Sequence, residues 1–308
     1  MAAIYLAWRV CSRLRPNRKS IQFGFPYVDT LKLQQRFVTD GVQFFPNGDV
    51  SELDELKRAV EDESIQAVYC ESPTNPLLVT PDILALRQIA TSHGCPLVVD
   101  DTLSAMLNTN TLAHCDLMTT SLTKFFSGGG DVLAGSLIIN TNGPNADALR
   151  QIVDEEYQDL FYDCDADALA TNSVDAAERI MRINGTAEAV ADFLANHPAV
   201  DRVFYPKFTS RQQYDSIRKP NGGFGGLLSI TLKNPSAAPR FYDALALAKG
   251  PNLGTNFSLV CPYTILAHYD ELEFAESCGV SRNLVRVSIG LEESDWLIQR
   301  FETALAAV

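Results

Sequence analysis

The chain has 308 residues, of which 46% are hydrophobic and 20% charged, and this composition is typical of a globular protein. The net charge of −13, from 38 acidic and 25 basic residues, argues against nucleic acid or an anionic membrane as the main partner, because both bind basic surfaces. Seven scattered cysteines without a CxxC or Cys/His spacing predict reduced thiols, a cytoplasmic location and no metal site, and no apolar stretch reaches the ~18–20 residues of a membrane helix.

The first half of the chain alternates helical and strand patterns. Amphipathic periodicity predicts helices at residues 3–14, 29–38, 51–61 and 80–94. Apolar, β-branched runs predict strands at residues 20–25, 41–45, 65–70, 96–101, 116–121 and 132–140. Thr80 is the expected N-cap of the fourth helix, with Pro81 at its first position and Gly94 just after its end. Buried strands divided by helices predict an α/β fold, with a mostly parallel sheet flanked by helices on both faces.

The pattern changes in the second half of the chain. Residues 145–196 are predicted to be mostly helical, with a connecting helix that breaks near Gly185 and is ended by Pro198. Three further strands are expected at residues 200–206, 227–233 and 284–290, and two helices at residues 241–249 and 294–308. This change favours two domains, residues 1–183 and a smaller α+β domain of residues 184–308.

Polar clusters follow three of the predicted strands, at residues 71–76, 100–102 and 121–131. Ligands of open α/β sheets bind beyond the carboxyl ends of the strands, so these clusters are the candidate site. A carboxylate such as Asp100 at the end of a buried strand is costly unless it meets a cation or hydrogen-bond donors. Taken alone, Asp100 is best interpreted as a cap or a strand-end acceptor. Lys124 fits either a nucleophilic amine or a surface lysine beside a glycine-rich loop.

Several motifs occur together in one order. SLTKFFSGGGDVLAGS, at residues 121–136, resembles the S-x-T-K-x-x-x-G-x-x-D-V-x-x-G signature of the Cys/Met metabolism (trans-sulfuration) family of pyridoxal-5'-phosphate (PLP) enzymes. ESPTNP, VVDDT, HPAVDRVFYP and LVRVSIGLEESDWLI resemble further segments of that family, so the resemblance covers essentially the whole chain. FGFPYVDTLK, at residues 23–32, is most similar to the fungal cystathionine γ-synthase-like branch.

The resemblance implies the type I fold of PLP-dependent transferases and a role for each matched residue. Lys124 is implied to hold PLP and to move protons during catalysis. Asp100 is implied to pair with the pyridinium nitrogen, and Asn75 to lie near the ring hydroxyl. Ser121 and Thr123 are implied to donate hydrogen bonds to the phosphate.

Two further assignments rest on the same resemblance. Tyr27 matches a catalytic tyrosine that stacks on the cofactor ring, although without the resemblance it is an ordinary loop aromatic. Arg286 matches the arginine that grips the substrate α-carboxylate, a bidentate role suited to a planar guanidinium. On its own, Arg286 is equally a strand arginine in a surface ion pair. Among the histidines, only His268 is kept as a candidate pocket residue.

The chain departs from the family pattern at three places. Met1 aligns with an internal position of the family, so we expect an N-terminal segment that helps bind the phosphate to be missing. Asp101 replaces the usual asparagine and is expected to add negative charge beside the cofactor. Asn252 and Phe257 replace a serine and a glutamate near the substrate, which argues against a standard acyl-homoserine specificity.

The resemblance favours a trans-sulfuration enzyme that replaces the γ-substituent of an activated homoserine by a thiol, as cystathionine γ-synthase does. Three alternatives stay open: a γ- or β-lyase, a γ-substitution enzyme of secondary metabolism, and a non-catalytic homologue that has lost tight PLP binding. The expected partners are a small amino-acid substrate and further copies of the chain, in a homodimer or homotetramer.

Overall fold

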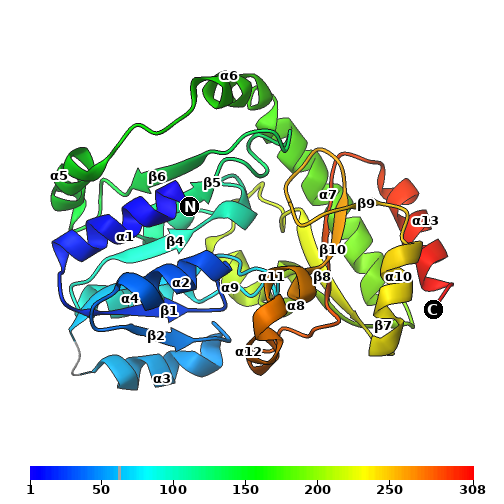
Figure 1. The fold of residues 1–308 in the computed structure, drawn as a ribbon, viewed down its shortest axis with the longest axis horizontal. Helices are drawn as coiled ribbons and strands as arrows, with labels where there is room; N and C mark the ends of the chain where they lie inside the picture. Colours follow the sequence, from blue (N-terminus) through cyan, green and yellow to red (C-terminus); the bar gives the residue numbers. More distant parts are fainter. Residues whose placement is uncertain (62–63) are drawn as a thin grey trace.

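The fold is built on two β-sheets that lie side by side in Figure 1. The computed structural model describes residues 1–61 and 64–308. The strands of the first sheet are β1 Lys19–Phe23, β2 Val42–Phe45, β3 Ile65–Glu71, β4 Leu97–Asp100, β5 Leu117–Ser121 and β6 Gly135–Ile139. Their order is β2-β1-β3-β4-β5-β6, and all neighbours are parallel except β5 and β6. The predicted mostly parallel sheet is therefore confirmed.

Helices cover both faces of this sheet, as the continuous apolar strands require. α1 Ala2–Leu14 and α5 Ala146–Glu156 bury Ala7, Val10 and Leu149 against one face. α3 Val50–Val60 and α4 Ile83–Ser92 pack against the other face. α2 Val28–Phe37 follows β1 and contacts α1. Each fully buried aliphatic side chain in these layers contributes about 1.5–3 kcal/mol, so the sheet is a rigid support for the groups at its edge.

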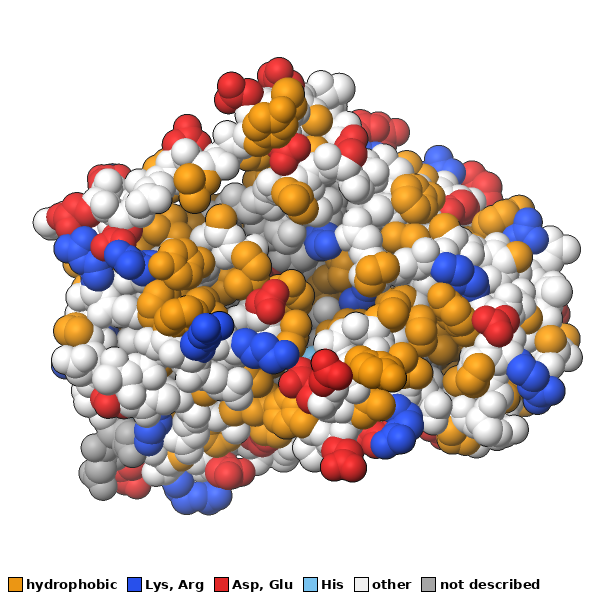
Figure 2. Space-filling model, viewed as in Figure 1, with side chains coloured by type: hydrophobic (Ala, Val, Ile, Leu, Met, Phe, Trp, Pro, Cys, Tyr) orange, Lys and Arg blue, Asp and Glu red, His pale blue; other side chains and the backbone are white. Residues whose placement is uncertain are grey.

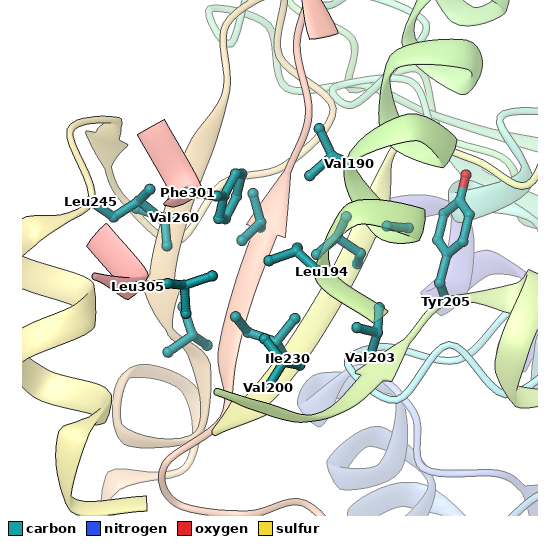
Figure 3. Close-up of a cluster of buried hydrophobic side chains, with 14 of the residues drawn as sticks. Val190, Leu194, Val200, Val203, Tyr205, Ile230, Leu245, Val260, Phe301 and Leu305 are labelled. Atoms are coloured by element: carbon teal, nitrogen blue, oxygen red, sulfur yellow. The ribbon is translucent and has the colours of Figure 1, made fainter. Parts of the chain in front are cut away.

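The second sheet is mainly antiparallel and holds its own core. Its strands are β7 Val200–Phe204, β8 Leu227–Leu232, β9 Ala248–Lys249, β10 Leu259–Pro262 and β11 Val285–Ser288, in the order β7-β8-β11-β10-β9. α7 Ala176–Ala195, α10 Ala238–Ala244 and α13 Ser294–Leu305 pack against it. Figure 3 shows Leu194 of α7 and Phe301 of α13 directed toward the strand residues Ile230 and Val260. The smaller α+β unit that was predicted is thus present.

The predicted N-cap of α4 was wrong. α4 begins at Ile83, and the Asp82 carboxylate caps it by accepting a hydrogen bond from the Ala85 backbone N–H at 2.9 Å. The Thr80 backbone N–H instead donates to the Ser210 hydroxyl at 2.6 Å, which ties the loop before α4 to the second half of the chain. Asp and Thr are both common N-cap residues, so the local sequence does not choose between Asp82 and Thr80. The long-range contact of the Thr80 backbone places that residue in the loop before the helix.

Two expectations for the second half were also wrong. α7 runs unbroken through Gly185, because Ile183, Asn184 and Ala187 around it are buried and this packing outweighs the cost of about 1 kcal/mol for a helical glycine. Helix α10 ends at Ala244, and residues 248–249 form the short strand β9. β10 was not predicted, because a four-residue strand that ends in proline gives little pattern to read.

Short helices complete the described part of the chain: α6 Asp163–Asn172, α8 Pro206–Thr209, α9 Arg211–Ile217, α11 Tyr263–Ala267 and α12 Leu272–Ser277. No helix among the described residues is long and apolar enough to cross a bilayer. The domain boundary predicted at residue 183 falls inside α7, and it stays a prediction.

Candidate active site

The carboxyl edge of the first sheet brings the three polar clusters together. Glu71, Asp100 and Ser121 are the last residues of β3, β4 and β5, which are neighbours in the sheet. Glu71 and Asp100 are direct partners in the β3–β4 register. Because parallel strands end at the same edge, side chains from segments far apart in sequence meet there.

The Asp100 carboxylate accepts hydrogen bonds from the Thr102 backbone N–H at 2.9 Å and from the Thr119 hydroxyl at 3.3 Å. Burial raises the pKa of Asp100, while these hydrogen bonds and the Met1 ammonium group oppose the rise. In the described part of the chain, no lysine or arginine side chain forms an ion pair with it. This carboxylate can therefore be stabilised further by a cation at the sheet edge.

Glu71 is a second buried carboxylate, which the sequence analysis did not single out. Its Oε1 accepts a hydrogen bond from the Tyr27 backbone N–H at 2.5 Å, and its Oε2 accepts one from the Asn75 backbone N–H at 3.2 Å. Burial and the neighbouring Asp100 carboxylate raise the pKa of Glu71. One side chain thus fixes the backbone of two predicted site residues. Its position as the first residue of the ESPTNP cluster was the available signal.

Lys124 lies in a tight turn directly after β5. Its backbone N–H donates to the Ser121 carbonyl at 3.2 Å, and its own carbonyl accepts from the Gly128 N–H at 2.8 Å. The Nζ atom donates to Oδ1 of Asn252 at 2.5 Å. Burial, and then the positive charge of Arg286, lower the pKa of Lys124 to about 8. A lysine whose pKa is lowered in this way has far more of the neutral, nucleophilic amine near neutral pH than an ordinary lysine, although the ammonium form still predominates.

Arg286 extends from β11 into the same region and is buried. Its Nη1 donates to Oδ1 of Asn75 at 3.1 Å, and its Nη2 donates to the Pro251 carbonyl at 2.5 Å. The guanidinium carbon lies 4.7 Å from the ring centre of Tyr263, a cation–π contact. No carboxylate among the described residues pairs with it. Figure 2 shows a hollow near the middle of the drawn face, with basic side chains inside it.

Tyr27 precedes α2 and is the most exposed of the predicted site residues, at 41%. Burial of its hydroxyl and a hydrogen bond with Asp29 raise the pKa of Tyr27 to about 12. The phenol therefore stays protonated near neutral pH. Its backbone is held by Glu71, so the ring projects from a fixed point beside the sheet edge.

The residues predicted to bind phosphate flank Lys124. The Thr123 hydroxyl donates to the Ala134 carbonyl at 3.3 Å and accepts from the Ala134 backbone N–H at 3.0 Å. The Ser121 backbone N–H donates to the Thr102 hydroxyl at 2.9 Å. The Thr123 hydroxyl is thus engaged by the backbone, and its phosphate contact stays a prediction, as does that of Ser121.

His268 lines a cavity of about 110 Å³ between α2 and the α11–α12 segment, together with Lys32, Glu271 and Phe274. Its Nδ1 lies 2.9 Å from a Glu271 oxygen, and its ring lies 5.8 Å from that of Tyr263. The histidine ring thus contacts Tyr263, whose ring in turn contacts the Arg286 guanidinium.

Asp101 was expected to add negative charge beside the cofactor, but its carboxylate is directed into the loop that follows β4. Its side chain is buried under the following loop, where Oδ1 accepts from the Thr109 and Thr111 hydroxyls at 3.0 and 2.7 Å. Oδ2 accepts from the Met106 backbone N–H at 3.0 Å. Burial raises the pKa of Asp101 to about 7. The residue therefore organises the loop at residues 102–111.

This raised pKa predicts that Asp101 makes stability depend on pH. A carboxyl group that binds its proton more tightly when folded contributes stability below its ordinary pKa of about 4, and loses it as the pH rises through the folded value. We expect the Asp101 contribution to fall by roughly 2–4 kcal/mol between pH 4 and pH 8. Asp101→Asn should remove that fall, so its melting temperature relative to the parent chain should be higher at pH 8 than at pH 5.

Thermal unfolding followed by circular dichroism at several pH values measures this difference. The exposed Asp54, which pairs only with Lys57 in the described structure, provides the control Asp54→Asn. A constant difference between Asp101→Asn and the parent chain across this pH range would contradict the prediction.

The segment at residues 252–256 packs directly on the turn that carries Lys124. Gly254 adopts a φ of +73°, and a Cβ atom there would lie 2.5 Å from the Phe125 nitrogen and 2.8 Å from the Lys124 carbonyl carbon. Two departures from the family pattern lie in this segment or directly after it. Asn252 contacts the Lys124 amine, whereas Phe257 is 47% exposed. The contact of Asn252 was not predictable, because 128 residues separate it from Lys124.

Gly254→Ala is expected to lower the free energy of unfolding by about 2–4 kcal/mol, since it combines an unfavourable φ with overpacking. It should also displace Lys124 and lower turnover. Gly41→Ala is the matched control, because Gly41 has a φ of +82° with nothing within 4 Å of the added Cβ. Urea unfolding should give a loss of only about 1–2 kcal/mol for the control. Equal losses for the two variants would contradict the predicted clash.

Comparison with known proteins gives the family of this chain. The family model described as Cys/Met metabolism PLP-dependent enzyme matches residues 26–306. The chain belongs to this family. The resemblance inferred from the motifs is therefore confirmed.

Individual relatives agree with the membership. The chain is 45% identical to a cystathionine gamma-synthase of Neurospora crassa over 99% of its own length and 50% of that protein. It is 41% identical to the cystathionine gamma-synthase-like enzyme iboG1 of Amanita muscaria, over 99% of the chain and 55% of that protein. The chain thus spans about half the length of these curated relatives. The cystathione gamma lyase CalE6 of Micromonospora echinospora superposes with a TM-score of 0.84 at 25% identity, covering 100% of this chain and 80% of that one. The predicted fold is confirmed.

The charges at the sheet edge fit the PLP of this family. Within residues 1–61 and 64–308, the site holds a carboxylate without a lysine or arginine partner, an amine with a lowered pKa and a buried guanidinium without a carboxylate partner. These groups belong to Asp100, Lys124 and Arg286. These are the groups that a protonated ring nitrogen, an aldehyde and a substrate carboxylate require. Among the described residues, no group of three or more His, Cys, Asp or Glu side chains is arranged to hold a metal ion.

Proposed function

We propose that this chain carries the PLP site of an enzyme that replaces the γ-substituent of an activated homoserine by a thiol. The observation that carries the proposal is the Lys124 amine, which is partly buried, donates to Asn252 and has its pKa lowered to about 8 by desolvation and by the positive charge of Arg286. In the reaction the bond from Cγ to the leaving carboxylate breaks, a C–S bond forms, and the thiol loses its proton. The relatives named cystathionine gamma-synthase support this class of reaction.

In this proposal PLP, when bound, withdraws electrons from the α-carbon of the substrate. Lys124 holds the cofactor and transfers protons through Nζ. Asp100 faces the ring nitrogen and keeps it protonated, which satisfies a carboxylate that is otherwise costly to bury. Arg286 binds the substrate α-carboxylate through its planar fork.

The remaining residues position these groups. Asn75 accepts from Arg286 through Oδ1, and its amide would donate to the ring hydroxyl of bound PLP. Tyr27, at the start of α2, would stack on the cofactor ring. Ser121 and Thr123 donate to the phosphate. For Thr123 this requires its hydroxyl proton to turn away from the Ala134 carbonyl, a weak bond at 3.3 Å.

The test is to express the chain with PLP, remove free cofactor, and record the visible spectrum. Borohydride reduction followed by peptide mass mapping then locates the adduct. A yellow protein with the adduct on Lys124 is expected, together with thioether formation from an acyl-homoserine and cysteine. A folded but colourless protein would refute the proposal for this chain and favour a non-catalytic homologue.

A second candidate is γ-substitution with another nucleophile, or γ- or β-elimination, in secondary metabolism. It is favoured by the amide of Asn252 against the Lys124 amine, at a position where the family pattern has a serine, and by Phe257 in place of a glutamate. Elimination releases ammonia and a keto acid, whereas replacement retains the amino group. Product analysis by mass spectrometry with and without a thiol separates the two.

The cellular setting is part of the same proposal. All seven cysteines are free and six are buried, which supports a reducing compartment such as the cytoplasm. Exposed large side chains cluster near α5 and α6, including Leu133, Leu160 and Tyr162, and support association into a homodimer or homotetramer. Light scattering of the purified chain tests the oligomeric state, and a monomer at micromolar concentration would refute it.

A further inference from the structure

Arg179 is a buried cation that none of the roles above uses. It lies in the first turn of α7, and its side chain is only 5% exposed. Its single anionic partner among the described residues is Asp175, whose carboxylate accepts from Nε at 2.7 Å and is 61% exposed. A guanidinium so deeply placed requires acceptors for its remaining N–H groups.

Those acceptors are the backbone of the turn that carries Lys124. Nη1 donates to the Phe125 carbonyl at 3.3 Å, and Nη2 donates to the Phe126 and Ser127 carbonyls at 3.0 and 3.2 Å. These are the three residues that follow Lys124. Nη2 also donates to the Asn172 carbonyl at 2.7 Å, which anchors the turn to the end of α6.

The same guanidinium reaches the segment that carries the acceptor of the Lys124 amine. Nη1 donates to Oδ1 of Asn256 at 3.0 Å, and the Asn256 backbone N–H donates to the Gly128 carbonyl at 2.8 Å. Gly128 has a φ of +70°, and a Cβ there would collide with both the guanidinium and the Asn256 side chain. Arg179 therefore lies between two segments, one that holds Lys124 and one that holds Asn252.

Only arginine has the donors for this arrangement. Its five N–H groups lie in one plane and leave the guanidinium in fixed directions, so three successive carbonyls and an amide can be bound at once. A lysine at the same position would keep the charge but offers one nitrogen with three hydrogens. Several carbonyls would then lose their donor, and the turn would be free to move.

We propose that Arg179 is a positioning residue for Lys124, which holds the turn at residues 124–128 and the segment at residues 252–256 together so that the amine stays buried against Asn252. The consequence for turnover rests on the proposed function, whereas the consequence for the amine does not. If the turn loosens, the Lys124 amine gains water and its pKa moves toward the ordinary value for lysine.

The experiment compares the full chain with Arg179→Lys, Asn256→Ala and Arg182→Lys. Arg182 lies one turn further along α7, is 52% exposed and pairs with Glu293 at 2.8 Å, so Arg182→Lys is the matched control. The rate of acetylation of Lys124 in the PLP-free chain is measured against pH by peptide mass spectrometry. Circular dichroism and thermal unfolding confirm that each variant is folded.

We expect the midpoint of Lys124 acetylation near pH 8 in the parent chain and in Arg182→Lys. In Arg179→Lys it should rise by about one pH unit or more, and in Asn256→Ala it should rise by a smaller amount. An unchanged midpoint in a folded Arg179→Lys would overturn the proposal. If that variant does not fold, Asn256→Ala decides: a raised midpoint supports the proposal, and an unchanged one overturns it.

Turnover gives a second readout with the PLP-loaded chain. Because Arg179 is not placed at the substrate, Arg179→Lys should lower kcat about tenfold or more with little change in KM. A change in KM alone would overturn the positioning role. Failure of the parent chain to form an adduct on Lys124 would refute the proposed function, while the acetylation midpoints would still decide the role of Arg179.

Discussion

Lys124→Ala is expected to abolish the borohydride-trapped PLP adduct and to lower kcat by about 10³-fold or more, since a positioned acid–base group alone contributes about 10²–10⁴-fold. The variant removes both the amine that holds the cofactor and the group that transfers protons. The Asn252 side chain would lose its donor, which is a modest cost for folding because the site is partly open to solvent. Absorbance spectra, peptide mapping and steady-state kinetics measure these effects.

The matched control is Lys57→Ala, because Lys57 is an exposed helix lysine that pairs only with Asp54 in the described structure. It should retain the adduct and the full rate. Turnover within about tenfold of the parent rate in Lys124→Ala would contradict the assignment, since the substitution removes the amine to which both roles are assigned.

Arg286→Lys is expected to raise the KM for the amino-acid substrate by about 10–100-fold, with a smaller effect on kcat. A lysine keeps the positive charge but loses the fork, and each charge-assisted hydrogen bond contributes about 1.5–3 kcal/mol. The variant also loses the hydrogen bonds from Arg286 to Asn75 and Pro251 and the cation–π contact with the Tyr263 ring. Initial rates against substrate concentration measure the change.

Arg282→Lys is the control for this substitution, because Arg282 is about half exposed and pairs with Glu276 on the surface. Its KM should equal that of the parent chain. An Arg286→Lys variant with unchanged KM would show that Arg286 serves only to hold Asn75 and the Pro251 carbonyl, and would refute its role in substrate binding.

The fold was largely predictable, because its signals are local. The helices and strands of the first sheet follow from amphipathic periods and apolar runs, within a few residues of their bounds. The errors arose where distant packing overrides a local preference. Gly185 remains helical because its neighbours are buried, and β10 is defined by its pairing with β11 rather than by its own four residues.

The site was predictable only where a motif marked it. Lys124 and Asp100 were identified by resemblance, and the strand order places them at the same edge of the sheet, after the neighbouring strands β5 and β4. Glu71 and Arg179 were not identified, because their side chains bind the backbone of other segments. The sequence pattern does not indicate such contacts. Asp101 was misread because side chains of consecutive residues at a strand end point to opposite sides, and its carboxylate is bound by the hydroxyls of Thr109 and Thr111 in the following loop.

Each of the two sheets supplies one partner of the hydrogen bond made by the Lys124 amine. Lys124 extends from the end of β5 in the first sheet, whereas Asn252 lies between β9 and β10 of the second. The hydrogen bond between Lys124 and Asn252 therefore links the two sheets. A hinge motion that parted the sheets would break this hydrogen bond, hydrate the amine and raise its pKa. Closure would bury the amine again and lower its pKa, so the contact between the two sheets sets the basicity of Lys124.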